Sequence, residues 1–380
     1  MRTYLIILIT FIAAAMLCAD LSGCKKYLIS PNHYSDSTIV AGADSAGFTN
    51  GPAANALFNH PFGLTLDKSG NIYVADQGNS LIRMITPGGE VSTFAGMVGM
   101  IGSANGIDTS ASFNKPFSVA ADSLGNVYVA DAGNNVIRKI GVDGTVSTFA
   151  GTGVPGSADG TDTATFNSPL GIAVDKAGNV YVADYGNDLI RKITPAGMVS
   201  TIAGKAGVPG AKDGLDTAAR FDLPESLAVD GSGNIYVADN GNNLIRKIRP
   251  DGTVSTLAGN GSAGKADGNS TQASFNSPFG IAIDGSGNIY IADSGNNEIR
   301  KMTPSGAVST FAGNGTKGAK DAMGLAATFN TPSGVAIDAA GNVYVADENN
   351  NLIRKITSAG AVSTFAITSK IGGIKLKKLH

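Results

Sequence analysis

One segment of this sequence occurs six times at a nearly constant interval. In its third copy the segment covers residues 178–193 and reads GNVYVADYGNDLIRKI. The aspartate in its middle recurs every 53 to 55 residues, at Asp76, Asp131, Asp184, Asp239, Asp293 and Asp347. A period of this length indicates a repeat architecture, in which each unit is one supersecondary structure that stacks on its neighbours.

Each unit reads as four short strands joined by three tight turns. In the third unit, apolar runs at 171–174, 180–183, 189–193 and 199–203 are separated by Gly- and Pro-containing turn sequences. Pro presets φ for a turn and Gly tolerates positive φ, and tight turns join antiparallel neighbours. Six such sheets can bury their faces when they surround a common axis. We therefore predict an all-β fold, a six-bladed β-propeller of four-stranded antiparallel blades.

The units resemble the NHL repeat family, whose members form six-bladed propellers. The resemblance rests on the motifs Pro-x-Gly-Ile-Ala-Val-Asp, Gly-Asn-Ile/Val-Tyr-Val-Ala-Asp, Gly-Asn-Asn and Ile-Arg-Lys-Ile, and it extends over about residues 38–366. NHL propellers include binding modules, sensors and a few lyases. The resemblance therefore specifies the fold and leaves the function open.

The beginning of the chain has the features of a lipoprotein signal peptide, which we place at residues 1–23. Arg2 precedes an uncharged apolar run at residues 5–17, which is too short to span a bilayer but suits a signal peptide. The sequence Leu21-Ser22-Gly23-Cys24 resembles a bacterial lipobox, which implies cleavage before Cys24 and lipidation of that residue. Several acyl chains would anchor the protein firmly to a membrane. We therefore expect it in the bacterial cell envelope, at the outer membrane, with the periplasmic and extracellular faces both open.

The remaining segments follow from the repeat. Residues 24–36 are predicted to be a tether, residues 37–366 the propeller and residues 367–380 a basic tail. Residues 38–42 resemble the fourth strand of the later units, so the chain contains seven copies of this strand and six of the others. Either this copy or residues 362–366 can complete the sixth blade, and the sequence leaves both open. A blade built from both termini would lock the ring, which favours a closing role for the N-terminal copy.

Polar residues that recur in every unit are interpreted as architecture. In the first unit, the strand register places Asp76 and Arg83 on one side of the sheet, one diagonal step apart, which predicts a charge pair between blades. The recurrent phenylalanines are predicted to fill the wedges between blades; they are Phe58, Phe113, Phe166, Phe221, Phe275 and Phe329. Two inter-unit loops carry two aspartates three residues apart, Asp159/Asp162 and Asp213/Asp216, and two more carry partial copies; these are too few oxygens for calcium. We predict no metal site there, although the sequence does not decide the question.

Function is expected where the units differ. Strand parity places the turns between strands two and three on one face together with the long inter-unit loops, and we name this the top face. One variable ring on it follows the repeated aspartate: Gln77, Ala132, Tyr185, Asn240, Ser294 and Glu348. A second ring opens strand one, which is innermost in a propeller: Phe62, Phe117, Leu170, Glu225, Phe279 and Ser333. We expect Phe62, Phe117 and Phe279 to form an apolar funnel at the channel mouth with Glu225 as its one charge.

The largest departures lie in the third and fourth units. Glu225-Ser226-Leu227 replaces the usual x-Gly-Ile, and Arg220, Asp222, Tyr185 and Asp188 belong to the neighbouring loops. We predict that these residues form a polar ligand-binding patch on the top face. The alternative is neutral drift on an exposed loop.

The sequence favours a binding protein over an enzyme. Downstream of the predicted cleavage site it has only His33, His60 and His380, and no catalytic residue or cofactor is predicted. A net charge of −2 provides no strong field for nucleic acid. We predict a monomeric, lipid-anchored binding or scaffolding propeller that recognises an envelope protein, a peptide or a glycan through its top face. The alternative is a calcium-assisted hydrolase or lyase that acts at the mouth of the channel.

Overall fold

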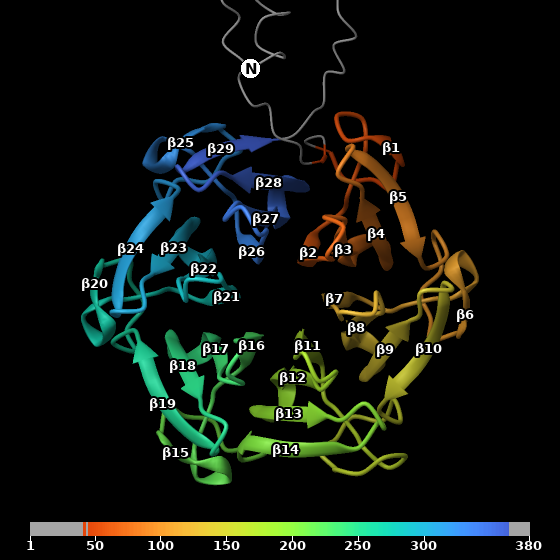
Figure 1. The fold of residues 1–380 in the computed structure, drawn as a ribbon, viewed down its shortest axis with the longest axis horizontal. Helices are drawn as coiled ribbons and strands as arrows, with labels where there is room; N and C mark the ends of the chain where they lie inside the picture. The colour runs from red at the N-terminus through yellow and green to blue at the C-terminus, as the bar shows by residue number, and fades with distance from the viewer. Residues whose placement is uncertain (1–40, 43–44, 365–380) are drawn as a thin grey trace, which may run out of the picture. The chain divides into compact units, whose positions relative to one another are not determined.

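The computed structural model describes Ala41, Gly42 and residues 45–364, which form a six-bladed β-propeller (Figure 1). The predicted fold class is therefore confirmed. The signal peptide, Cys24, the tether and the basic tail lie outside the described residues and remain predictions. No helix in the described part of the chain is both long and apolar enough to cross a membrane.

Each blade has four main antiparallel strands, arranged in chain order from the axis to the rim. The innermost strands are β2 (Pro61–Leu66), β7 (Pro116–Ala121), β11 (Pro169–Val174), β16 (Pro224–Val229), β21 (Pro278–Ile283) and β26 (Pro332–Ile337). The second strands are β3 (Ile72–Asp76), β8 (Val127–Asp131), β12 (Val180–Asp184), β17 (Ile235–Asp239), β22 (Ile289–Asp293) and β27 (Val343–Asp347). All five residues of each second strand are buried, because neighbouring blades cover both faces of the sheet.

The outer half of each blade follows the same order. The third strands are β4 (Leu81–Ile85), β9 (Val136–Ile140), β13 (Leu189–Ile193), β18 (Leu244–Ile248), β23 (Glu298–Met302) and β28 (Leu352–Ile356). The fourth strands are β5 (Glu90–Ala95), β10 (Thr145–Ala150), β14 (Val199–Gly204), β19 (Thr253–Ala258), β24 (Ala307–Ala312) and β29 (Ala361–Thr364). We number the blades 1 to 6 in this order.

Five of the six sheets contain a fifth strand, so the prediction of four-stranded blades is incomplete. Two residues of the preceding inter-blade loop pair with the fourth strand at the rim, as Gly51 does with Val91. These short strands are β1 (Gly51–Pro52), β6 (Gly106–Ile107), β15 (Gly214–Leu215), β20 (Gly268–Asn269) and β25 (Ala322–Met323). Blade 3 has only an isolated bridge between Gly160 and Val199 at this place. The added residues cover part of an otherwise open sheet edge.

The remaining regular structure consists of single 3₁₀ turns. One set joins the second and third strands: η1 (Gln77–Asn79), η3 (Ala132–Asn134), η4 (Tyr185–Asn187), η6 (Asn240–Asn242), η8 (Ser294–Asn296) and η10 (Glu348–Asn350). The other set lies in the inter-blade loops: η2 (Asp108–Ser110), η5 (Asp216–Ala218), η7 (Ser270–Gln272) and η9 (Gly324–Ala326). By strand parity the first set lies on the top face. The second set lies at the rim, where the amide of Asp108 donates to the carbonyl of Gly144 in the turn between β9 and β10 (2.9 Å). The inter-blade loops therefore extend beyond the predicted top face.

Both ends of the described chain contribute to the fourth strand of blade 6. In blade 1, Ile82 of the third strand pairs with Ala95 of the fourth. Among the described residues of blade 6, β29 pairs with β28 as far as Thr364, and the amide of Ile353 donates to the carbonyl of Ala41 (2.8 Å). Ala41 is fully buried and packs in the cluster that contains Ile353. Ala41 and β29 therefore share the outer edge of blade 6, and we call them together the split strand. Each of the two terminal segments that the sequence offered for this edge contributes to it.

A buried ion pair fixes each blade to the loop that precedes it. In blade 1, Arg83 Nη1 lies 2.9 Å from Asp76 Oδ2, and both side chains are fully buried. The same guanidinium donates to the carbonyls of Leu57 (2.9 Å) and Thr49 (3.1 Å) and to Asn50 Oδ1 (2.6 Å). The register-based prediction of a charge pair in all six blades is confirmed.

The recurrent phenylalanines occupy the wedges between blades, as predicted. Phe58 is fully buried in a cluster that combines Val74 and Ile85 of blade 1 with Ala346 and Ile353 of blade 6. The five other phenylalanines lie in equivalent clusters between consecutive blades. The ring of each also lies beneath the buried arginine of its blade, at 5.1 Å in blade 1. The apolar core of the protein is therefore distributed over six wedges around the axis.

Candidate functional site

The innermost strands of all six blades line one central cavity of about 250 Å³. Near its top end, Phe62 contacts Phe117 with a ring-centroid distance of 3.6 Å and Phe279 with 5.7 Å. Phe62 is buried, whereas the other two rings are partly exposed. The predicted apolar funnel therefore exists as a cluster of three rings that pack on one another and narrow the channel.

Glu225 belongs to the same ring of positions as these phenylalanines. It is the second residue of β16 and lines the cavity, yet only 5% of its surface is exposed. Within the described part of the chain, no hydrogen bond or ion pair reaches its carboxylate. Burial, reinforced by the negative charge of Glu348, raises the pKa of Glu225 from 4.5 to about 8. The interpretation as drift on an exposed loop therefore does not fit this residue.

Tyr185 and two aspartates surround the same position. Tyr185 is the first residue of η4, and its partly buried hydroxyl has a raised pKa because of burial and of the charges of Glu225, Asp222 and Asp188. The pKa of Asp188 is also raised, by burial first and then by Asp222, while a backbone hydrogen bond opposes the shift. The structure thus brings together four of the five residues of the predicted patch.

Arg220 is the fifth residue, and its guanidinium is directed elsewhere. Its Nη1 donates to the carbonyls of Thr217 (2.8 Å) and Ala219 (2.6 Å), which belong to its own loop. No ion pair links it to a described carboxylate, and it has no part in the pKa shifts of the patch. Arg220 therefore orders the inter-blade loop and leaves the negative charge of the patch uncompensated.

Asp188 has a structural role that the sequence analysis missed. It ends the turn after η4 with a left-handed φ of 58°, and its Oδ1 accepts a hydrogen bond from the amide of Leu223 in the next blade (3.0 Å). The equivalent residue of every other blade accepts the same inter-blade bond; these residues are Ser80, Asn135, Asn243, Asn297 and Asn351. The recurrence of the Gly-Asn-Asn motif was the available signal, because a polar side chain at this turn joins consecutive blades.

A second glutamate lies at the channel mouth, from blade 6. Glu348 begins η10, and its Oε1 lies 3.4 Å from Nδ1 of His60 in blade 1. Burial raises the pKa of Glu348, and the contact with His60 opposes that shift. Its electrostatic interaction with Glu225 places both glutamates at the same end of the channel. The sequence analysis placed Glu348 in the variable ring and did not select it for the site.

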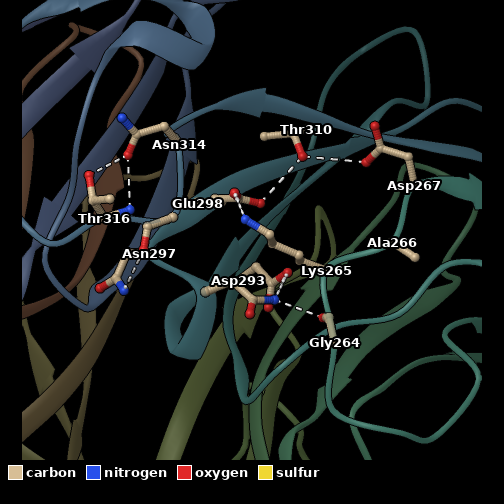
Figure 2. A network of polar contacts seen from close by, with 12 residues as sticks. Gly264, Lys265, Ala266, Asp267, Asp293, Asn297, Glu298, Thr310, Asn314 and Thr316 are labelled. Carbon is tan, nitrogen blue, oxygen red and sulfur yellow. Dashed lines mark hydrogen bonds and ion pairs between the residues drawn. The ribbon is translucent and has the colours of Figure 1, made fainter.

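A further polar network breaks the repeat in blade 5 (Figure 2). Glu298 begins the third strand, where the other blades have Leu or Val, and it is 4% exposed. Lys265 of the preceding loop lies 3.7 Å from its Oε1, and the hydroxyl of Thr310 donates to its Oε2 (3.3 Å). Because its carboxylate is paired, Glu298 is a structural substitution that Lys265 compensates. A position-by-position comparison of the six units would have revealed it.

The inter-blade aspartates are engaged in the scaffold. In blades 3 to 6, the first aspartate of each loop lies 2.7 to 2.8 Å from the buried arginine of its blade. These residues are Asp159, Asp213, Asp267 and Asp321. The described residues include no group of three His, Cys, Asp or Glu side chains that could hold a metal ion. The calcium-assisted alternative therefore gains no support from these residues.

Comparison with known proteins agrees with the repeat and the fold. The NHL repeat family model matches residues 166–193, 221–248, 275–302 and 329–356, which belong to blades 3 to 6. The fold and the matched segments together define an NHL-repeat β-propeller, and the chain carries NHL repeats.

The curated relatives are much longer proteins. The chain is similar to Protein SUPPRESSOR OF QUENCHING 1, chloroplastic, of Arabidopsis thaliana, with 32% identity over 282 residues, covering 69% of this chain and 26% of the relative. It is also similar to NHL repeat-containing protein 2 of Bos taurus, with 28% identity over 361 residues, covering 83% of this chain and 49% of the relative. The chain thus spans less than half the length of either protein.

Solved structures of low sequence identity share the fold. A protein of unknown function from Bacteroides thetaiotaomicron has a TM-score of 0.64 and 22% identity, over 86% of this chain and 75% of that one. An auxiliary nutrient binding protein from the same organism has a TM-score of 0.64 and 17% identity, over 86% and 76%. The virginiamycin B lyase of Staphylococcus aureus has a TM-score of 0.52 and 17% identity, over 82% and 86%. At these identities the likeness shows the fold alone.

Proposed function

We propose that this protein is a lipid-anchored binding or scaffolding propeller of the cell envelope, which recognises a protein, peptide or glycan through its top face. The ligand is expected at the channel mouth, where blades 3 and 4 meet. One observation carries the proposal: Glu225 is buried and has no hydrogen-bond partner among the described residues, at a position that is uncharged in the other five blades. A buried carboxyl group without a partner is unfavourable for folding, which supports a functional reason for its presence.

The similar solved structures provide a weaker argument in the same direction. One of them is described as an auxiliary nutrient binding protein of a Bacteroides species, and it has the same overall fold. A binding role in the envelope is consistent with that description and with the predicted lipobox at Cys24.

The binding role can be tested by affinity capture from an envelope extract of the source cells. The immobilised full chain, its Glu225→Gln and Tyr185→Phe variants and an Asp251→Asn control would be compared. Asp251 lies in an exposed turn between β18 and β19, at the end of the blade opposite the top face. We expect a component that the parent protein and the control retain and that both site variants lose. Capture that is the same for all four proteins would refute the proposed site.

The anchor requires its own experiment. Cells that express the full chain or a Cys24→Ser variant would be labelled with a radioactive fatty acid and fractionated. We expect label and membrane association in the parent chain and loss of both in the variant. Equal labelling of the two chains would contradict lipidation at Cys24.

A further inference from the structure

The boundary of blades 3 and 4 differs from the other blade boundaries mainly in charge. Asp188 replaces the Ser or Asn that five blades carry at the end of the turn between strands two and three. Asp222 replaces an asparagine that the other five blades have two residues before the first proline of strand one. Glu225 replaces Phe, Leu or Ser directly after that proline. Three carboxyl groups therefore occupy one boundary at positions that are uncharged elsewhere.

The fold does not require these charges. Asp and Asn have nearly the same shape, and the bond from Leu223 to Asp188 (3.0 Å) matches the bond from Ser277 to Asn243 (2.8 Å) in the next boundary. An asparagine at either aspartate position would preserve the backbone geometry, as it does in the other blades. The difference that the substitutions introduce is therefore negative charge.

That charge has no described counter-ion. Arg220 donates to two carbonyl groups of its own loop, and His60 contacts Glu348 on the far side of the mouth. Glu225 is buried in the lining of the central cavity, and its carboxylate lacks a hydrogen bond within the described residues. The site therefore contains the carboxyl groups of Asp188 and Asp222 and the buried carboxyl group of Glu225. A positively charged ligand would offset their negative charge.

The nature of the surrounding side chains limits the kind of cation. Calcium takes six to eight oxygen ligands at short distances, and no described group of three metal-binding side chains is present at the mouth. Phe62 and Phe279, whose rings stack at 5.7 Å, line the same cavity as Glu225. Aromatic faces attract ammonium and guanidinium groups, and they also cover the apolar part of such a ligand. The composition of the mouth thus favours an organic cation over a metal ion.

We propose that Glu225, Asp222, Asp188 and Tyr185 form a recognition site for an organic cation, such as the ammonium or guanidinium group of a basic peptide segment. This inference rests on the proposed function, because it takes the same top-face site as the ligand-binding site. Among the ligand classes considered above, it selects a basic peptide or protein segment. Asp188 contributes charge while it retains its hydrogen bond to the next blade.

The experiment compares a simple cation with its neutral analogue. Binding of n-hexylammonium and of 1-hexanol to the purified full chain would be measured at about pH 9, where Glu225 is largely ionised and hexylammonium is still charged, by calorimetry and by ligand-observed NMR. We expect the cation to bind at least about tenfold more tightly than the alcohol, with an affinity that decreases as salt is added. The Glu225→Gln variant and the Asp188→Asn/Asp222→Asn double variant should each reduce cation affinity about tenfold and leave hexanol unaffected. The double variant reproduces the residues of other blades, so it should fold like the parent protein.

The control and the outcomes separate this inference from the proposed function. Asp251→Asn removes a carboxylate outside the site and should leave cation binding unchanged. Equal binding of hexylammonium and hexanol, no binding of either, or unchanged cation affinity in both site variants would overturn the inference. If the site variants lose the captured envelope component but hexylammonium does not displace it, the proposed function stands and the cation specificity is refuted. If capture itself does not depend on the site, the proposed function fails.

Discussion

The burial of Glu225 predicts an unusual dependence of stability on pH. The perturbation is Glu225→Gln, which keeps the size of the side chain and removes its ionisation. Below pH 4.5 the carboxyl group is protonated in the folded and unfolded chains alike, so the parent protein pays no penalty for ionisation. Between about pH 4.5 and 8 the unfolded chain releases the proton while the folded protein retains it. The parent protein therefore loses stability as the pH rises through this range, and the loss levels off above about pH 8.

The magnitude follows from the two pKa values. A pKa raised from 4.5 to about 8 corresponds to about 5 kcal/mol at most. We expect the stability difference between Glu225→Gln and the parent protein to shift by several kcal/mol in favour of the variant between pH 4 and pH 9. The other buried carboxyl groups titrate in both proteins, so their contributions cancel in the difference to a first approximation.

The assay is urea-induced unfolding, followed by fluorescence and circular dichroism at closely spaced pH values. Both probes must coincide before a free energy is assigned to the transition. Asp251→Asn serves as the control, because its exposed carboxylate should produce no such loss between pH 4.5 and 8. A stability difference for Glu225→Gln that does not change with pH would refute the reasoning, since it would mean that water reaches Glu225 in the folded protein.

Three further perturbations test the scaffold. Lys265→Ala should destabilise the protein by about 1 kcal/mol, because Lys265 is largely exposed and Glu298 keeps its hydrogen bond from Thr310, whereas Glu298→Leu, the residue of most other blades, should be neutral or stabilising; equal losses in thermal unfolding would contradict the pairing. Asp76→Asn should cost about 1 kcal/mol more than Asp347→Asn, because Arg354 keeps a second carboxylate, that of Asp321, whereas Arg83 keeps only the amide oxygen of Asn50; the opposite order in urea unfolding would be inconsistent with that role. Gly42→Val should lower the melting temperature, because a Cβ at a φ of 128° would lie 2.6 Å from a backbone carbonyl of blade 6; an unchanged melting temperature would exclude Gly42 from the closed ring.

Much of the fold could be predicted because antiparallel register is a local property. Once the turn after Asp76 was recognised, the pairing of Val74 with Arg83 and the charge pair followed from residue counting, and the structure has both. The rim strands were not predictable in the same way, because two residues of a glycine-rich loop carry no periodic pattern. The split strand of blade 6 forms when segments from the two ends of the propeller meet. Because all copies of the fourth strand are similar in sequence, the sequence does not specify which copy pairs with β28.

The candidate site shows a different limit. The sequence placed Glu225 and Phe62 in one ring at the channel, and the structure puts both in the lining of the cavity. It did not predict that Glu225 would be buried, because burial depends on how six blades pack around the axis. Conversely, the sequence analysis grouped Arg220 with the ligand-binding patch because of its position in the chain. The structure excludes it from the patch, because its guanidinium donates to a carbonyl group of its own loop.

The split strand also bears on how the protein is made. Ala41 is synthesised near the beginning and Val362 near the end, yet both belong to the outer edge of one blade. During translation, the first five blades can form one after another while blade 1 still lacks its neighbour and Phe58 lacks half of its packing partners. The nascent chain therefore exposes two apolar flanks until β29 has emerged, and this interval is when aggregation or chaperone binding would compete with ring closure.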